Sequence, residues 1–331
     1  MTTITQKILK NKWFPNSLRF SALLFSIFLM LLLYLGSIKL FNIKFTSYWA
    51  LFVIWTLWWP FLYISVLFFS RIWCGFLCPL GLANEAGEKF RIKKKTINIA
   101  KWGFLAYVLF FVIVLLEQIS GLFISEKITL LFFGIFFIAA FVLGLLFARW
   151  SFCKIICPIG TILSVFSRLS FIGLRTQQDK CKVCKTFECL KGTNAGFCPT
   201  YINIPLIQSN KNCLLCARCI KNCPYDSADI KFVQPGEEVL KESEFKLEES
   251  IFIIALLGLT FVLNSKGTEF FRKFFGFLNL EGASLRTSDF IVTIGFVLFI
   301  FLVLAWISSK IFRIDLTTSL KKTGYIYLPL T

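Results

Sequence analysis

The sequence contains no histidine and two methionines among its 331 residues. Without histidine the chain has no imidazole ligand for haem, no C-x-x-C-H haem attachment motif and no imidazole general base. The same absence excludes zinc sites with mixed cysteine and histidine ligands, and two methionines argue against a methionine copper site. Histidine-ligated haem and histidine-based catalysis are therefore excluded, and no haem is expected.

The sequence also lacks the motifs of nucleotide-binding and nucleophilic enzymes. No G-x-G-x-x-G follows an expected strand and no P-loop is present, so neither nicotinamide nor ATP binding is expected. No serine or cysteine stands in a recognisable arrangement with a general base. We therefore expect no catalytic residues in this chain.

Cysteine is abundant by contrast, with 12 residues, most of them in one stretch. Its second half reads C-x2-C-x2-C-x3-C-P, like the run that binds a [4Fe–4S] cluster in bacterial ferredoxins. That run consists of Cys213, Cys216, Cys219, Cys223 and Pro224. A looser copy precedes it, formed by Cys181, Cys184, Cys189, Cys198 and Pro199. Thiolates at this spacing suit iron–sulfur clusters or zinc, and the Cys-Pro endings favour iron over a zinc ribbon or a disulfide knot.

The resemblance to two-cluster ferredoxins implies a ligand set for each cluster. In those proteins the fourth cysteine of each run ligates the other cluster. One [4Fe–4S] cluster is then expected on Cys181, Cys184, Cys189 and Cys223. The second is expected on Cys213, Cys216, Cys219 and Cys198. The wider gaps before Cys189 and Cys198 depart from the ferredoxin spacing, so the set of eight ligands is firmer than its division in two.

Hydrophobic residues make up 57% of the chain, which predicts a membrane protein. Apolar runs long enough to cross about 30 Å of hydrocarbon are Phe20–Leu40, Trp49–Phe69, Trp102–Ile124, Leu130–Trp150 and Phe290–Phe312. The shorter run Ile251–Asn264 is counted as a span because the topology needs an even number. The expected fold is an α-helical membrane protein of about six transmembrane helices with an inserted small α+β dicluster ferredoxin-like domain.

Basic residues predict the orientation in the membrane. They precede the first span and lie between the second and third, as Lys7, Lys10, Lys12, Arg19, Arg71, Lys89, Arg91, Lys93, Lys94, Lys95 and Lys101. By the positive-inside rule, both termini and the cysteine-rich stretch face the cytoplasm of a multi-pass inner-membrane protein. The net charge of +18 then reflects orientation and anionic lipid, and no nucleic-acid partner is expected. Cytoplasmic thiols stay reduced, which favours metal ligation over disulfides.

The second and fourth spans end in an internal repeat, R-I-W-C-G-F-L-C-P-L-G and R-W-S-F-C-K-I-I-C-P-I-G. The cysteines of these C-x3-C-P motifs are Cys74, Cys78, Cys153 and Cys157. Each pair shares one helix face if the helix continues, although Pro79 and Pro158 disfavour helix at the second cysteine. We favour a third iron–sulfur cluster on these four residues over a thiol redox pair or simple packing. Arg71 and Arg149 are interpreted as positive-inside anchors or as cofactor-binding residues that offset the cluster charge.

These features divide the chain into four expected parts. Residues 1–175 form a four-helix membrane domain with the two C-x3-C-P motifs, and residues 176–235 form a cytoplasmic domain with two [4Fe–4S] clusters. Residues 236–250 are a charged helical connector. Residues 251–331 are a C-terminal transmembrane pair and tail.

Paired C-x3-C-P motifs after transmembrane helices, followed by a dicluster ferredoxin module, resemble the NapH-type membrane ferredoxins of periplasmic nitrate reductase systems. They are also similar to the membrane core of the NosR and CcoG families. The resemblance covers roughly residues 15–235. No large N-terminal extracytoplasmic flavin domain is evident, unlike in NosR, and no C-terminal soluble β-domain, unlike in CcoG. The resemblance implies electron transfer at the membrane, often between the quinone pool and an extracytoplasmic reductase.

We therefore expect a membrane-bound iron–sulfur electron-transfer subunit of an oxidoreductase complex, with two [4Fe–4S] clusters, a possible third and no haem. It would relay electrons between the quinone pool or a cytoplasmic donor and a partner reductase. The expected partners are membrane lipid, other redox subunits of a membrane complex and quinone. Two alternatives stay open, a CcoG-like metal-reducing or assembly factor and a NosR-like redox regulator. Co-purification with stoichiometric redox subunits distinguishes a conductor from an assembly factor.

Overall fold

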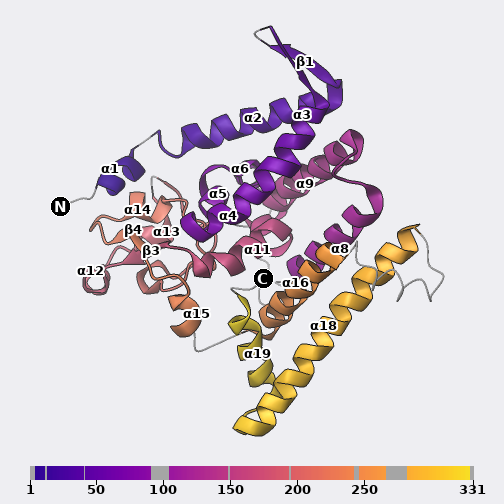
Figure 1. Cartoon of the computed structure of the whole chain (residues 1–331). Coiled ribbons are helices and arrows are strands. Elements are labelled where there is room, and N and C mark those ends of the chain that lie inside the picture. Colours follow the sequence, from indigo (N-terminus) through magenta and orange to yellow (C-terminus); the bar gives the residue numbers. More distant parts are fainter. Residues whose placement is uncertain are drawn as a thin grey trace. The chain divides into compact units, whose positions relative to one another are not determined.

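The computed structural model describes residues 4–11, 13–40, 42–90, 104–147, 150–193, 195–241, 246–265 and 282–328. Within these ranges the chain is mostly helical (Figure 1). It divides into two compact units, which are described separately. The first comprises Met1–Ala106 and Phe123–Glu238, and the second comprises Tyr107–Leu122 and Val239–Thr331.

Among the described residues, four helices are long and apolar enough to cross a membrane, which supports a membrane protein. They are Asn16–Leu35, Ser47–Phe69, Glu126–Leu146 and Phe290–Phe312. The first is α2 and the third is α9, while the second joins α3 (Ser47–Leu51), a π-helical stretch (Phe52–Trp58) and α4 (Trp59–Phe69). Helix α8 (Leu105–Ser120) occupies part of the expected span Trp102–Ile124, and α16 (Leu247–Ser265) contains the expected span Ile251–Asn264. The count of six spans stays a prediction.

The predicted bounds of the first span are wrong at its C-terminal end. Helix α2 ends at Leu35 because Gly36 has a φ of 75°, a left-handed conformation that commonly ends helices. The next residues form β1 (Ser37–Leu40), which pairs antiparallel with β2 (Ile43–Thr46). The hydrophobic run therefore continues past the helix into a hairpin.

In the first unit, α6 (Pro79–Lys89) packs against α9 with the two backbones in contact. A Cβ atom at Gly87 would lie 2.2 Å from the carbonyl oxygen of Phe141, and one at Gly144 would lie 2.2 Å from that of Asn84. The Asn84 amide donates a hydrogen bond of 2.6 Å to the carbonyl of Ala140. Glycines allow this close approach, as in many membrane helix pairs. The crossing fixes the segment that follows the first C-x3-C-P motif.

The cysteine-rich stretch lies between two paired strands of the first unit. Strand β3 (Ile172–Thr176) is antiparallel to β4 (Ala228–Phe232), and the predicted domain boundary at residue 176 falls at the end of β3. Between them lie the short helices α12 (Gln178–Lys182), α13 (Glu188–Lys191) and α14 (Arg218–Asn222). Figure 1 shows these elements gathered beside α1 (Ile4–Lys10). We call the segment from β3 to β4 the module.

Asn210 joins the module to the segment before β3. Its buried side-chain amide donates hydrogen bonds to the Ser170 hydroxyl and the Ile172 carbonyl, both at 2.9 Å. Its side-chain oxygen accepts one from Arg175 at 3.0 Å. Its backbone N–H donates to the Glu238 carboxylate at 2.8 Å. The amide satisfies several buried polar groups at once.

Changing Asn210 to leucine is expected to destabilise the module by about 2–4 kcal/mol, because it leaves buried donors and acceptors without partners. The melting temperature of the detergent-purified protein should fall by several degrees. Gln178→Ala is the matched control, since its amide makes an exposed hydrogen bond of 2.9 Å to the Pro205 carbonyl. Equal melting temperatures for the two variants would contradict the prediction.

The second unit contains α16, α18 (Gly282–Phe312) and α19 (Leu316–Ile326), together with most of α8. Its helices meet around the buried carboxylate of Glu249, which accepts hydrogen bonds from the hydroxyls of Tyr325 and Tyr107. A Cβ atom at Gly324 would lie 2.5 Å from the Cβ of Ser250, so α16 and α19 cross closely. Hydrogen-bonded tyrosines make a buried carboxylate tolerable in an apolar bundle.

Candidate metal centres

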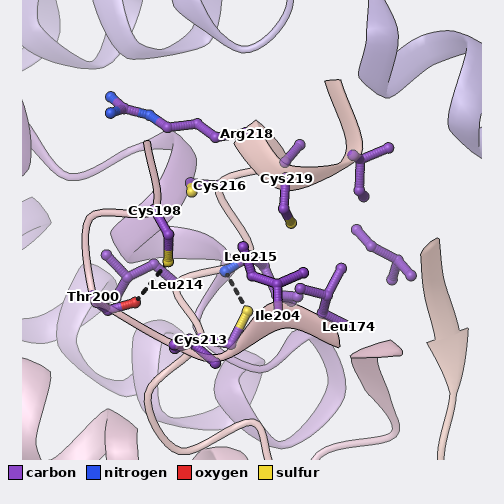
Figure 2. A pocket seen from close by; sticks show the side chains of 14 residues that line it. Leu174, Cys198, Thr200, Ile204, Cys213, Leu214, Leu215, Cys216, Arg218 and Cys219 are labelled. Carbon is purple, nitrogen blue, oxygen red and sulfur yellow. Dashed lines mark hydrogen bonds between the residues drawn. The ribbon is translucent and has the colours of Figure 1, made fainter. Parts of the chain in front are cut away.

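Four cysteines line one pocket of the module (Figure 2). They are Cys198, Cys213, Cys216 and Cys219. The first belongs to the loose run and the other three belong to the tight run, which is the grouping expected for the second cluster. The rest of the lining is mostly apolar and includes Leu174, Ile204 and Leu215. An apolar lining with soft thiolates is the donor set that an iron–sulfur cluster requires.

The backbone of the tight run bends to bring N–H groups toward sulfur. Leu215 and Ala217 have φ angles of 50° and 58°, which are uncommon for residues other than glycine. The N–H of Leu215 donates to the sulfur of Cys213 at 3.4 Å. The N–H of Ser227 donates to the sulfur of Cys223 at 3.2 Å. Such bonds stabilise a thiolate and are one of the factors that set cluster potentials.

The other four module cysteines also lie together. Burial raises the pKa of the Cys189 thiol to about 11, and Cys223, Cys184 and Cys181 are near enough to raise it as well. This is the grouping expected for the first cluster. Burial also raises the pKa of Cys219, with contributions from the pocket cysteines and from Cys189. Cys189 therefore lies where the two groups adjoin.

The four cysteines of the C-x3-C-P motifs form a third group. We call Cys74, Cys78, Cys153 and Cys157 the quartet. Burial is the largest cause of the raised pKa of Cys153, and the neighbouring Cys157, Cys78 and Cys74 raise this pKa further. Burial raises the pKa of Cys157 to about 12, with Cys78 the next contributor. Two segments some 80 residues apart thus bring their cysteines to one place.

The two cysteines of each motif do not lie on one continuous helix, which agrees with the expectation that Pro79 and Pro158 disfavour helix at the second cysteine. Cys74 lies within α5 (Ile72–Phe76), and Cys78 has an extended backbone directly before α6. Cys153 lies within α10 (Ser151–Ile155), and Cys157 precedes α11 (Pro158–Phe166) in the same way. The prolines stop the first helix and start the next. Cys78 and Cys157 therefore stand at helix N-termini, where the helix dipole favours negative charge.

The chemistry of the three groups fits iron–sulfur ligation. None of the 12 cysteines forms a disulfide. Within the described ranges, no three cysteine or carboxylate side chains are arranged to hold a single metal ion. In a cubane cluster each thiolate binds a different iron atom. Neutral thiols tolerate the burial seen here, whereas thiolates need a metal or another cation to offset it.

Of the two arginines expected near the quartet, one is described. Arg71 is buried and donates a hydrogen bond of 2.8 Å to the Lys211 carbonyl. A Cβ atom at Gly160 would lie 3.4 Å from both Nη2 of Arg71 and the sulfur of Cys157, so the guanidinium adjoins the quartet. Arg149 lies outside the described residues.

Arg19 is a further candidate for a residue that offsets cluster charge. From the sequence, it was interpreted only as a charge that orients the chain in the membrane. Its side chain is buried, pairs with Glu85 at 2.8 Å and donates to the carbonyl of Gly75 at 3.0 Å. Its guanidinium carbon lies 5.0 Å from the ring centroid of Trp150. The only hint in the sequence is that this arginine directly precedes a long apolar run, which is also where orienting charges occur.

Comparison with known proteins supports an iron–sulfur protein. Residues 51–98 and 129–174 match a family described as a 4Fe-4S binding domain, and each match contains one C-x3-C-P motif. An uncharacterized protein of Methanocaldococcus jannaschii is 28% identical over 198 residues, which cover 51% of this chain and 75% of that protein. No solved structure matches the chain.

Two further relatives have descriptive names. The ferredoxin-type protein NapH of Haemophilus influenzae is 27% identical over 187 residues, 48% of this chain and 63% of NapH. The regulatory protein NosR of Stutzerimonas stutzeri is 29% identical over 156 residues, 40% of this chain and 21% of NosR. The matches thus span less than two thirds of either named relative. This chain is therefore similar in sequence to the ferredoxin-type protein NapH and to the regulatory protein NosR.

Proposed function

We propose that the chain is a membrane electron-transfer subunit that holds three [4Fe–4S] clusters. Two would be held by the eight cysteines of the module and the third by the quartet. The observation that carries this proposal is that the cysteines form three neighbouring groups of four. A cluster supplies reversible one-electron chemistry when it is bound. Three adjoining groups are what a conductor of single electrons needs.

The residues of the chain hold and shield these sites. The apolar lining of the pocket keeps water from the sulfur atoms, and the N–H groups of Leu215 and Ser227 stabilise negative charge on them. Cys189, which belongs to the group expected to hold the first cluster, lies next to the pocket cysteines. The quartet adjoins the same pocket through Gly75, whose Cβ atom would lie 3.0 Å from the Cα of Cys216. From these contacts, the three groups lie in the order quartet, pocket, and then the group of Cys181, Cys184, Cys189 and Cys223.

We further propose six spans, with the module and both termini facing the cytoplasm of the inner membrane. The chain would pass electrons between the quinone pool or a cytoplasmic donor and a partner reductase complex outside the cytoplasm. Its partners would be membrane lipid, quinone and other redox subunits. The four candidate spans and the ferredoxin-type relative support this role.

Protein purified without oxygen should contain about twelve iron and twelve sulfide per chain, four of each for every cluster. Colorimetric iron and sulfide determination on detergent-purified protein measures both. About eight of each would restrict the clusters to the module. A zinc-loaded preparation free of iron would overturn the proposal.

A second candidate function is a redox regulator, which is favoured by the relative named regulatory protein NosR. A conductor should co-purify with redox subunits in fixed ratio, whereas a regulator should not. Quantitative mass spectrometry of the complex extracted in mild detergent separates the two. The ratio of this chain to its partners decides between them.

A further inference from the structure

The quartet and the pocket touch each other through their backbones. Gly75 lies directly after Cys74, and a Cβ atom on it would lie 2.3 Å from the carbonyl oxygen of Leu214. The same atom would lie 3.0 Å from both N and Cα of Cys216. Only glycine permits this approach, because both partners at the contact are backbone. We call this contact the junction.

Arg19 lies at the junction. Its Nε donates to the carbonyl of Gly75 at 3.0 Å, and its Nη1 pairs with Glu85 at 2.8 Å. Arg218 pairs with the other oxygen of Glu85 at 2.6 Å, and both guanidiniums lie over the Trp150 ring, at 5.0 and 5.3 Å. Arg19 is 5% exposed, and its Nη2 has no hydrogen-bond partner among the described residues. A buried cationic nitrogen without a partner is costly, and an anionic neighbour would offset that cost.

Arg71 provides a second buried cation close to both the quartet and the pocket. Its Nη2 adjoins Cys157 of the quartet, as the space around Gly160 shows. Its Nη1 donates to the carbonyl of Lys211, two residues before Cys213 of the pocket. The side chain is 4% exposed, and its Nε has no partner within the described part of the chain. Arg71 therefore spans the same boundary as Arg19.

Among the described residues, the charges at the junction do not balance. Arg19 and Arg218 pair with the single carboxylate of Glu85, and Arg71 has no carboxylate partner in the described part of the chain. Burial opposes ionisation of Glu85, but Arg218 and Arg19 hold its pKa below the usual range, so it is ionised. Two positive charges are then left over in a largely apolar interior, which is costly unless anions lie beside them. A [4Fe–4S] cluster with four thiolates carries about −2 and becomes more negative on reduction.

We propose that Arg19 and Arg71 form a two-cation junction that stabilises the reduced form of the quartet site and of the pocket site together. This inference rests on the proposed function. One electron lost at one site is gained at the other, no bond changes and no proton moves. Because both guanidiniums lie beside the junction, their charges favour the electron on either site and raise both reduction potentials. Arg19 and Arg71 are positioning residues in this account and touch no substrate.

The test is a redox titration of the full-length protein in detergent, followed by electron paramagnetic resonance. Arg19→Gln should make reduction of both the quartet site and the pocket site about tenfold less favourable, which is about 59 mV for a one-electron couple. Arg19→Lys keeps the charge and should shift both less. Arg218→Gln is the matched control, because Arg218 lines the pocket between Cys216 and Cys219, so only the pocket site should shift.

Glu85→Gln tests the same idea with the opposite sign. Removing this carboxylate should make reduction of both sites more favourable, and a general disturbance of the fold would not reverse the direction. If Arg19→Gln fails to fold, Glu85→Gln still tests the inference. Unshifted potentials in both variants, at full iron content, would overturn the two-cation junction and leave the electron-transfer proposal standing. Absence of clusters from the unmodified protein would instead overturn the proposed function.

Discussion

Changing Cys157 to serine should remove one whole [4Fe–4S] cluster, so that iron per chain falls by about a third while the two module clusters remain. A serine oxygen is a poor ligand for this cluster compared with a thiolate, which is the soft donor that iron–sulfur clusters require. Apart from the loss of a ligand, this substitution should disturb the local fold little. The sulfur of Cys157 accepts a hydrogen bond of 3.3 Å from the N–H of Gly160, and serine is a favoured residue at such a helix start. Loss of iron would therefore report ligation rather than loss of α11.

Electron paramagnetic resonance of the reduced protein and iron determination measure this result. Ser151→Ala is the control, because it removes a hydrogen bond of 3.1 Å to the Leu143 carbonyl close to Cys153 without removing a thiol. It should keep all of its iron. If serine or alanine variants of every quartet cysteine keep full iron content, the quartet is packing, and the module is a dicluster ferredoxin on an electrically silent anchor.

Changing Gly75 to alanine should separate the quartet from the pocket. The added methyl group would meet the Leu214 carbonyl at 2.3 Å, so one backbone segment has to move. Forced movement in a packed interior costs about 1–3 kcal/mol. The protein should melt at a lower temperature, and electrons should equilibrate more slowly between the two sites after rapid reduction. Melting and stopped-flow absorbance measure these effects.

Gly134→Ala is the matched control for this prediction. Gly134 lies in α9, and nothing stands within 4 Å of a Cβ atom built there. Alanine favours helix over glycine by about 1 kcal/mol, so this variant should be as stable as the unmodified protein or more so. If Gly75→Ala melts at the same temperature as the unmodified protein and exchanges electrons between the two sites at the same rate, the junction is looser than the backbone contact implies.

Local spacing was enough to indicate the chemistry of this chain. A ferredoxin-like cysteine run is recognisable because consecutive ligands must reach one cluster, and this restricts the number of residues between them. Length and hydropathy were enough to indicate a membrane protein, because a helix must cross a fixed thickness of hydrocarbon. The span bounds were less predictable. The conformation of Gly36 ended α2 before its apolar run was complete.

The sequence by itself was enough to indicate an iron–sulfur membrane protein with two C-x3-C-P motifs, since these properties depend on residue type and short spacing. Only the tertiary structure brought Gly75 against Leu214 and placed the Arg19 side chain against the carbonyl of Gly75. An arginine at the edge of an apolar run has the same pattern whether it orients a helix or lies buried against a distant loop. Contacts between segments more than a hundred residues apart depend on how the helices pack, and local spacing carries no record of them.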